Sequence, residues 1–418
     1  MAEPTYRAPP GTRDLMPPAA ARFRAVVATF GELAERAGFD LVVPPMFEDI
    51  GVFLRLGEAT DVVTKEMYAF ETKGGDKLAL RPEQTASVVR AFVEHRPDTP
   101  WKAWYAGPNF RYERPQAGRY RQFDQVGVEV LGTDDAAADV EVIALGWRFY
   151  EAVGLRQVTL KINSLGSIGD RARYIAALRT YFDGHAGVLS AQSRATLETN
   201  PLRVLDSKRD EDAPVIAGAP RLIDALSDEA AVHFEAVTAG LTQLGIPFTL
   251  EPRLVRGLDY YTRTTFEYSA GALESAQDAV GGGGRYDGLS EALGGPPTPG
   301  IGLALGVDRV LLACDAEGAF PAPATAVDVF VVDVVDGTSA TVLCDALRRA
   351  GMRADRAFDG RSMKSQMKRA GASGAAVALI VGEQEQADGT VVVRDQRTSE
   401  QQAVARDDVI DRVRKLLP

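Results

Sequence analysis

The chain has 418 residues, 45% of them hydrophobic and 25% charged, a composition typical of a soluble globular protein with two or three domains. Its formal net charge of −11 argues against a protein that coats nucleic acid nonspecifically, because that binding depends on Lys and Arg, although a local basic patch stays compatible with it. Two cysteines and three scattered histidines predict neither a disulfide framework nor a metal site, while the polar, proline-rich start and the lack of a run of about 18 apolar residues predict a cytoplasmic protein without a membrane span.

The first predicted elements are a helix and a group of closely spaced strands. Apolar residues at helical spacing predict a helix from Ala19 to Arg36, which Gly38 ends before the extended stretch FDLVVPP. Strand-like stretches follow in the order MYAFETK, KLALRPEQT, WKAWYAGPNFRYERP, YRQFDQVGVEVLG and VTLKINSLG. Because parallel neighbours need crossovers of a dozen or more residues, this close spacing predicts antiparallel pairing.

The residue pattern changes twice in the second half of the chain. Residues 169–244 are rich in alanine and charge at helical spacing, which predicts a helical insertion. Strands resume at FTLEP and LVRGLDYYTRTTFEY, and TPGIGLALGVDRVLLAC is typical of a strand that leads into a helix. The proline-rich and alanine-rich residues 318–326 predict a linker. Strands alternate with helices in residues 327–418, which predicts a small α/β domain with a parallel or mixed sheet.

The stretch FRYERPQAGRYRQFDQVGVEV carries the most specific chemical pattern. Period-two alternation on its second strand separates a valine face from a face formed by Gln125, Gly127 and Glu129. A glycine between two polar side chains predicts a slot in which a flat polar ligand lies on the sheet.

Arginines surround the turn that joins these two strands. Arg111 and Glu113 are expected on one face of the first strand, and the connecting loop adds Arg114, Arg119 and Arg121. Because a guanidinium fork binds phosphate oxygens bidentately, this density predicts a phosphate site. A solvated hairpin with a basic tip is the alternative.

Polar residues beside other predicted strands are further candidates. Glu83 and Thr85 follow a strand, where a carboxylate and a hydroxyl suit a ligand ammonium group, although the same residues also suit a helix start. The run Gly281–Gly284 fits neither a dinucleotide loop nor a nucleotide P-loop. We expect it to be a flat backbone that a ligand approaches, with Arg285 and Tyr286 at its rim.

The stretch LVRGLDYYTRTTFEY puts Arg256, Tyr260 and Tyr261 beside a strand with no fully apolar face. Such a pattern suits a wall that a ligand completes, and a surface ion pair with wet tyrosines is the alternative. Arg309 lies where a strand passes into a helix, and an ordinary surface arginine is its alternative.

A cationic cluster is predicted near the end of the chain. Arg361, Lys364 and Lys368 stand at i, i+3 and i+7, which predicts one face of a helix from Ser362 to Arg369. An acidic protein that binds RNA must concentrate its cations locally, and this helix is a candidate place. A solvated helix face is the alternative.

Many of these stretches resemble, in the same order, those of the histidyl-tRNA synthetases, a class II aminoacyl-tRNA synthetase family. FDLVVPP (39–45) resembles the end of motif 1, residues 101–132 resemble motif 2, residues 300–313 resemble motif 3, and RGLDYYTRTTFEY resembles the family's own signature. PGTRDLMP, RPEQTA, INSLG, GGGGRYDGL and GRSMKSQMKRA extend the resemblance over nearly the whole chain.

The resemblance implies an α+β fold and a reaction. Residues 1–320 would form a catalytic domain with an antiparallel six-stranded sheet flanked by helices and the insertion 169–244, and residues 327–418 an α/β anticodon-binding domain. The chain would be a histidine–tRNA ligase and a homodimer built on motif 1. Its substrates would be L-histidine, ATP and the tRNA for histidine, with Mg²⁺ expected on the ATP.

The resemblance also assigns roles to residues. Arg256 and Arg111 would be catalytic, on opposite sides of the α-phosphate. Histidine would be bound by Glu83, Thr85, Arg111, Gln125, Glu129, Arg256, Tyr260, Tyr261 and Tyr286. ATP would be bound by Arg111, Glu113, Arg119, Tyr120 and Arg309, with Glu113 on the adenine amino group and Arg309 on the γ-phosphate. The cations proposed for tRNA are Arg361, Lys364 and Lys368.

The sequence departs from the family pattern at three positions. Gln84 stands where many members have glycine, Asp124 where histidine is common, and Asp308 where glutamate is frequent. None of these changes removes a residue with an assigned role.

Two alternatives have different functions. The regulatory subunit of ATP phosphoribosyltransferase, a histidine sensor, shares the catalytic-domain fold, but the C-terminal domain and the set Arg111, Arg256 and Arg309 argue against it. A synthetase for threonine or proline is the other alternative. The tyrosine pair, the slot between Gln125 and Glu129, and the lack of a Cys/His zinc set argue against that one.

Overall fold

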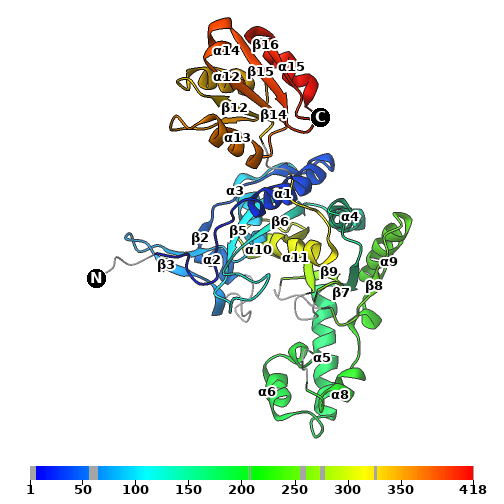
Figure 1. Ribbon diagram of the computed structural model, residues 1–418. Coiled ribbons are helices and arrows are strands. Elements are labelled where there is room, and N and C mark those ends of the chain that lie inside the picture. The colour runs from blue at the N-terminus through cyan, green and yellow to red at the C-terminus, as the bar shows by residue number, and fades with distance from the viewer. Residues whose placement is uncertain are drawn as a thin grey trace. The chain divides into compact units, whose positions relative to one another are not determined.

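A computed structural model describes residues 6–55, 65–205, 207, 209–254, 260–273, 278–323 and 327–417. The chain divides into two compact units, Met1–Ala322 and Pro323–Pro418, which we describe separately (Figure 1). Within the described ranges, no helix is long and apolar enough to cross a membrane.

The first unit is built on a mixed sheet with the strand order β1-β5-β6-β11-β10-β9-β7-β8. The strands are β1 (Asp40–Leu41), β5 (Trp101–Phe110), β6 (Gln122–Leu131), β7 (Val158–Ser164), β8 (Thr249–Leu250), β9 (Thr262–Ala270), β10 (Ala279–Arg285) and β11 (Gly300–Gly306). The central strands from β5 to β7 are antiparallel, as predicted, while β1 and β8 pair in parallel with β5 and β7 at the two edges. The six antiparallel strands match the predicted sheet, and the two edge strands lie within FDLVVPP and FTLEP, which the sequence predicts as extended without indicating their parallel pairing.

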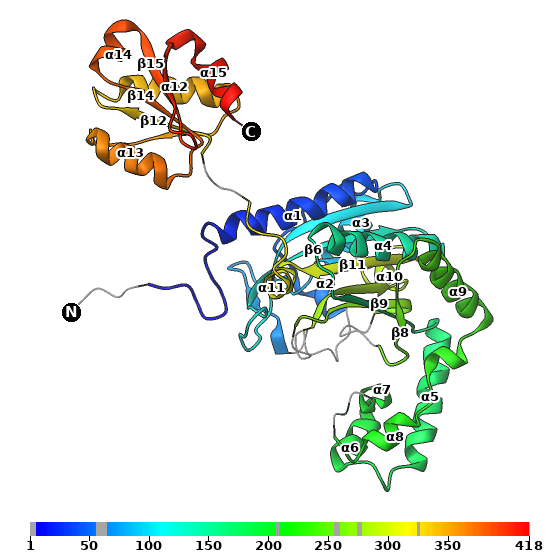
Figure 2. The same cartoon turned by 45° about the vertical axis from the view of Figure 1, so that its right-hand side comes forward.

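One face of this sheet is covered by helices α1 (Ala19–Arg36), α4 (Ala136–Ala152), α9 (Asp228–Gln243) and α11 (Val307–Glu317) (Figure 2). Their apolar side chains pack against alternate strand residues such as Val128, Phe266 and Leu303, which are fully buried. α1 has the predicted bounds, and Gly38 beyond it has φ +78°, a conformation that glycine adopts without strain.

The opposite face is only partly covered by apolar residues. Val88 of α3 (Thr85–His95) packs on Ala103 and Tyr105 of β5. A second cluster joins α3 to α2 (Ile50–Leu54) and α10 (Leu289–Ala292), and a small sheet with the order β2-β4-β3 lies beside it. Its strands are β2 (Phe47–Asp49), β3 (Ala69–Glu71) and β4 (Lys77–Leu80).

The stretch predicted as a helical insertion is helical, but its parts belong to two cores. The elements α5 (Ile168–Gly184), α6 (Ala191–Thr199), α7 (Pro201–Val204), α8 (Ala213–Ala217) and η2 (Leu222–Ala225) share a separate apolar core. The last helix, α9, packs on α4 within the main core. The separate lobe, which extends away from the sheet in Figure 1, therefore ends before α9.

The second unit has a mixed sheet with the order β13-β12-β14-β15-β16. Its elements are β12 (Val329–Asp333), α12 (Thr338–Arg349), β13 (Ala354–Arg356), α13 (Met363–Ala372), β14 (Val377–Val381), α14 (Glu383–Asp388), β15 (Thr390–Asp395), β16 (Gln401–Ala405), η3 (Arg406–Asp408) and α15 (Val409–Leu416). β13, β12 and β14 are parallel, and β15 and β16 are antiparallel. This is the small α/β arrangement that the alternating pattern predicts.

Candidate functional site

A buried carboxyl group lies on the less covered face of the main sheet. Glu129 of β6 has no exposed surface, and its Oε1 accepts hydrogen bonds from the hydroxyl groups of Thr85 (2.7 Å) and Tyr105 (3.2 Å). Its Oε2 accepts one from the hydroxyl group of Tyr286 (2.5 Å). Gly302 on the neighbouring strand makes room for this arrangement, because a Cβ there would lie 1.7 Å from Glu129 Oε2.

A second carboxyl group, Glu83, lies nearby and is also buried. Its Oε1 accepts a hydrogen bond from the backbone of Ala86 (2.9 Å), so it also serves the start of α3. Burial raises the pKa of Glu83, and burial together with the charge of Glu83 raises the pKa of Glu129 to about 8. Removing charged carboxylates from water is costly, so a ligand that brings a cation or N–H donors would relieve this cost. We call the carboxyl cluster the group formed by Glu83, Glu129 and the three hydroxyl groups that donate to Glu129.

The predicted slot over Gly127 is filled by a side chain. Tyr105 lies directly opposite Gly127 on β5, and a Cβ at residue 127 would lie 2.4 Å from the Tyr105 hydroxyl. The prediction that a flat ligand lies over Gly127 between Gln125 and Glu129 is therefore wrong, because the glycine admits a tyrosine instead. Gln125 accepts a hydrogen bond from Asn109 Nδ2 (2.7 Å), and neither Asn109 nor Tyr105 was among the predicted site residues. Cross-strand pairing of an aromatic residue with a glycine is the signal that could have revealed Tyr105.

A pocket of about 360 Å³ adjoins the strand ends β5 and β6. The predicted ATP-binding residues all line it, namely Arg111, Glu113, Arg119, Tyr120 and Arg309. Arg119 Nε lies 2.9 Å from Glu113 Oε2, and Arg309 Nη1 donates to the carbonyl of Ala279 (2.8 Å). Burial lowers the pKa of Arg309, and the charge of Arg119 adds to this shift. We call this hollow the arginine pocket; acidic side chains also line it, and its three arginines, Arg111, Arg119 and Arg309, are the groups that suit a polyanion.

Arg111 links the arginine pocket to the carboxyl cluster. It lines the pocket, and its Nε donates to the carbonyl of Pro82 (2.9 Å), the residue before Glu83. Its charge also opposes the rise in the pKa of Glu83. Arg111 and Glu113 lie beyond the end of β5 at Phe110, so the prediction that they share a strand face is wrong. The ladder to β6 ends at that residue, and the chain turns into the loop.

The predicted tyrosine wall is described in part. Arg256 lies outside the described residues. The ring centroids of Tyr260 and Tyr261 are 4.6 Å apart, and Tyr260 lies 5.9 Å from Tyr286 in an edge-to-face arrangement. Because Tyr286 donates to Glu129, the tyrosine pair is connected to the carboxyl cluster through one ring.

The sequence predicts Arg285 at the rim of a ligand site, and this prediction is wrong. It is fully buried, and its Nη2 lies 2.6 Å from Oδ2 of Asp139 on α4. At Gly283 a Cβ would lie 1.9 Å from the carbonyl oxygen of Gly302, so this glycine allows close packing of β10 and β11. Arg285 instead anchors the strand that carries Tyr286, and its partner Asp139 was missed because the two are far apart in the sequence.

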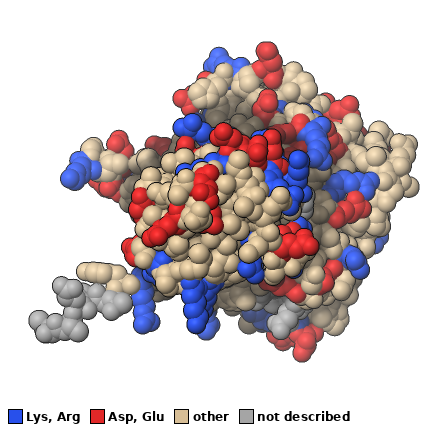
Figure 3. All heavy atoms as spheres, turned by 45° about the horizontal axis from the view of Figure 1, so that its top comes forward, with Lys and Arg blue, Asp and Glu red and all other residues tan. Residues whose placement is uncertain are grey.

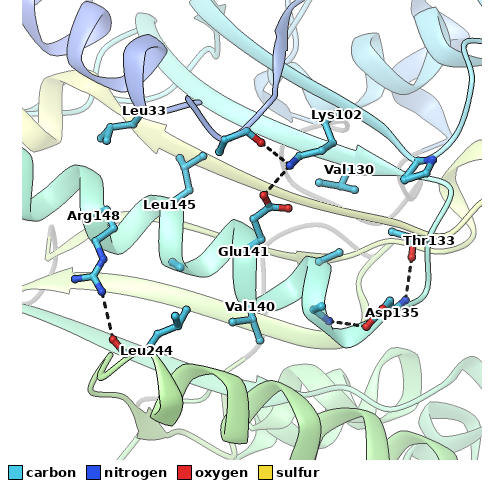
Figure 4. A pocket seen from close by; sticks show the side chains of 15 residues that line it. Leu33, Lys102, Val130, Thr133, Asp135, Val140, Glu141, Leu145, Arg148 and Leu244 are labelled. Atoms are coloured by element: carbon cyan, nitrogen blue, oxygen red, sulfur yellow. Dashed lines mark hydrogen bonds and ion pairs between the residues drawn. The ribbon is translucent and has the colours of Figure 1, made fainter. Parts of the chain in front are cut away.

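A larger hollow of about 660 Å³ lies on the helical face, between α1, α4 and the end of α9 (Figure 4). Its polar groups are already paired. Lys102 Nζ donates to the carbonyl of Ala37 (2.5 Å) and to Glu141 (2.6 Å), and Arg148 donates to the carbonyl of Leu244 (3.3 Å). None of the predicted site residues that the structure describes lines this hollow, which favours the sheet-face site as the functional one.

The predicted cationic helix face in the second unit needs a correction. α13 begins at Met363 with Ser362 as its N-cap, so Arg361 precedes the helix and does not share a face with the two lysines. Ser362 has extended backbone angles (φ −61°, ψ 155°), and its side chain makes no capping hydrogen bond, so the helix starts after it. Lys364 and Lys368 are exposed one turn apart on α13. On the face shown in Figure 3, positive and negative side chains are interspersed. A polyanion would therefore bind where a few cations stand together, as Lys364 and Lys368 do.

Comparison with known proteins adds independent information. A family model described as histidyl-tRNA synthetase matches residues 11–310, and one described as an anticodon-binding domain matches residues 328–416. A histidine–tRNA ligase of Rhodococcus erythropolis is 48% identical over 99% of this chain and 98% of its own length. One of Corynebacterium kroppenstedtii is 47% identical over 98% of this chain and 97% of its own length.

Solved structures give the same family likeness as the sequence comparisons. The apo histidyl-tRNA synthetase of S. aureus is 35% identical and superposes with a TM-score of 0.83, over 98% of this chain and 100% of that one. A structure from Bacillus halodurans C, described as an ATP phosphoribosyltransferase regulatory subunit/histidyl-tRNA synthetase, has a TM-score of 0.66, with 91% of this chain and 99% of that one covered. It is 20% identical, so it shows the shared fold alone.

Proposed function

The chain belongs to the histidyl-tRNA synthetase family, and on that premise we propose that its main sheet binds histidine and ATP side by side and joins them as histidyl-adenylate. It is thus an aminoacyl-tRNA synthetase, a histidine–tRNA ligase by its full-length relatives. The histidine-sensor alternative is less supported, because these close relatives are ligases. One observation carries the site proposal: Arg111 lies between the carboxyl cluster and the arginine pocket.

The carboxyl cluster is the proposed histidine subsite. Glu83 and Thr85 would receive the α-amino group, and Glu129 would accept an N–H of the imidazole ring. The raised pKa values of the two glutamates support this role, since a bound ammonium group or ring N–H would offset the cost of their burial. Further ring contacts are proposed for Gln125, Tyr260, Tyr261 and Tyr286. Buried hydrogen-bonding groups of this kind reject analogues that leave them unpaired.

The arginine pocket is the proposed ATP subsite. An oxygen of the histidine carboxylate would attack the α-phosphorus, forming a P–O bond as pyrophosphate leaves. Arg111 would neutralise charge at the α-phosphate, Arg309 would hold the γ-phosphate, and Glu113 would meet the adenine amino group. Arg119 and Tyr120 would complete this subsite. Such an in-line displacement depends on positioning and charge neutralisation rather than on a general base.

The second step would transfer the histidyl group from the adenylate to the 3′-terminal ribose of the tRNA, with release of AMP. Arg256 is the proposed second catalytic arginine, on the side of the α-phosphate opposite Arg111. Its role rests on the resemblance of the stretch RGLDYYTRTTFEY alone.

Magnesium would enter bound to ATP rather than be held by a set of protein ligands. Among the described residues, no group of three or more His, Cys, Asp and Glu side chains could hold a metal ion. Bound to the β- and γ-phosphates, Mg²⁺ would neutralise part of their charge, as in other phosphoryl-transfer sites.

The two units would divide the work. We propose that residues 1–320 are the catalytic domain, that 318–326 link the two parts, and that 327–418 bind the anticodon region of the tRNA, with Arg361, Lys364 and Lys368 among its phosphate contacts. The match of an anticodon-binding model to residues 328–416 supports this division. We further propose a homodimer that works in the cytoplasm, where its ATP and tRNA are found.

Histidine-dependent exchange of pyrophosphate into ATP tests the proposed function. We expect exchange with histidine and not with threonine or proline. Arg256→Ala should abolish exchange and leave histidine binding, followed by calorimetry, largely intact. Purified protein that binds histidine without exchange would support the sensor alternative instead. Exchange driven by another amino acid would overturn the specificity.

A further inference from the structure

We propose that Arg13, in the segment before α1, is a positioning residue of the arginine pocket. It braces the loop of residues 111–121 against α11 and neutralises two aspartates that face the pocket, Asp124 and Asp308. The inference rests on the proposed binding of ATP in this pocket.

Arg13 contacts both elements that form the pocket. Its guanidinium group forms an ion pair with Asp308, the second residue of α11, and stacks over the ring of Tyr120 with 3.8 Å from Cζ to the ring centroid. Asp308 and Tyr120 line the pocket, and Asp308 directly precedes Arg309, the proposed γ-phosphate ligand. One side chain therefore joins the loop to the helix on which the proposed triphosphate contacts stand.

The segment that carries Arg13 is itself fixed to the sheet. The carbonyl of Gly11 accepts hydrogen bonds from the backbone of Arg121 (2.8 Å) and Gln122 (3.4 Å), at the start of β6. A Cβ at Gly11 would lie 2.6 Å from Arg121 Cγ, and φ of +83° there favours glycine. Thr12 closes a turn onto the carbonyl of Pro9 (3.0 Å). These contacts fix the backbone next to Arg13.

The charge of Arg13 matters because the pocket also contains paired acids. Asp124 and Asp308 both line it, and the backbone N–H of Asp124 donates to the Asp308 carboxylate. Burial and the charge of Asp308 raise the pKa of Asp124 to about 6, while Arg13 and Arg81 oppose this rise. Without Arg13, two partly buried carboxyl groups would face a triphosphate with less opposing positive charge. Repulsion between like charges in a partly desolvated site is costly.

The test compares Arg13→Gln with wild type in histidine-dependent pyrophosphate exchange by the full-length chain. We expect KM for ATP to rise by about tenfold while KM for histidine stays within about twofold, because the lost charge acts on the triphosphate. Arg13→Lys, which keeps the charge, should recover part of the loss. Asp124→Asn in the Arg13→Gln background should lower KM for ATP again by at least about threefold.

Arg22→Gln is a matched control. Arg22 of α1 also forms an ion pair with α11, through Asp315, but neither residue lines the pocket. Its removal should leave KM for ATP unchanged. ATP binding without histidine, measured by equilibrium dialysis, should rank the variants in the same order and does not depend on turnover.

Several results would overturn the inference. These are an unchanged KM for ATP in Arg13→Gln, an equal rise in both KM values, failure of Asp124→Asn to recover affinity, or loss of kcat alone in step with a lowered unfolding temperature. Wild-type protein without exchange would instead contradict the proposed function, and the dialysis series would then decide whether Arg13 controls ATP binding.

Discussion

Glu129 combines a cost in stability with a proposed role in binding. The native state holds a proton on this carboxyl group up to a pKa of about 8, whereas an unfolded chain releases it near 4.5. The native state therefore binds more protons between these values, and the free energy of unfolding falls as pH rises through this window. Glu129→Gln keeps the shape and removes the titration. We expect the variant to be more stable than wild type at pH 8, by up to about 4 kcal/mol, and to lose this advantage near pH 4.5.

The same variant should bind histidine at least about tenfold more weakly, because a neutral amide oxygen accepts a weaker hydrogen bond from a ring N–H than a charged carboxylate does. Urea unfolding at several pH values and calorimetric titration with histidine measure the two effects. Glu94→Gln is the control, because Glu94 is an exposed carboxyl group on the adjacent helix α3 and should change neither. Lower stability of Glu129→Gln at pH 8 would contradict the assignment of Glu129 as a buried acid whose ionisation destabilises the native state.

Residue types and the family resemblance together predicted which residues gather at the site better than how they are arranged. Arg111, Glu113 and Arg119 were predicted from a charge-rich loop, whereas Tyr120 and the γ-phosphate role of Arg309 came from the family resemblance, and all five line one pocket. The filled space over Gly127 was not predicted. Alternation gives the faces of one strand, whereas the side chain that occupies a gap comes from a neighbouring strand, whose register the sequence does not state.

At the scale of elements, long periodic segments were the most predictable. α1 extends over 18 residues with a clear apolar stripe, and its predicted bounds are confirmed. The edge strands β1 and β8 lie in the predicted extended stretches FDLVVPP and FTLEP, but their parallel pairing was not predicted, because strands of two residues carry too little pattern to show their partners. The boundary of the insertion was misplaced at α9, because an amphipathic helix shows that it packs on something without showing on which core.

The exposed lysines of α13 give a prediction at this scale. Replacing Lys364 and Lys368 together by alanine should raise KM for tRNA by about three- to tenfold in aminoacylation and reduce its dependence on salt, because fewer phosphate charges are neutralised. Pyrophosphate exchange, which needs no tRNA, should not change. Arg414 and Lys415 in the last turn of α15 are exposed cations of the same unit, and their double alanine variant is the control.

Equal losses in the two double variants would assign the effect to overall charge rather than to α13. No loss in either would remove α13 from the proposed tRNA surface. In both cases pyrophosphate exchange would still report on the catalytic unit, so the two proposals remain separable.

For the whole molecule, net charge and the separation of the cores bear on how tRNA is bound. A chain with a net charge of −11 repels RNA at long range, so binding must depend on local cations and on shape. Each unit has its own apolar core, with separate clusters in the main sheet and in the C-terminal sheet. Changes in one unit are therefore expected to leave folding of the other intact, and this independence makes the comparison of exchange with aminoacylation informative.

The exposed edge of the main sheet gives the last prediction, on the proposed homodimer. Among the described residues β1 pairs with β5 alone, and large apolar side chains in β1 and just after it have much exposed surface: Leu41 54%, Val43 75% and Met46 53%. An unpaired strand edge beside such side chains favours association with a second copy of the chain. We expect sedimentation at micromolar concentration to show twice the 44.9 kDa chain mass, and Val43→Glu to shift it toward monomer by burying a charge.

Val232→Glu is the matched control, because Val232 on α9 is also exposed, at 65%, but lies away from this edge. It should leave the dimer unchanged. A wild-type chain that sediments as a monomer, or a Val43→Glu dimer as stable as the wild type, would contradict an interface at β1. A monomeric variant would also show whether the arginine pocket, whose lining residues come from one chain, binds ATP without the partner.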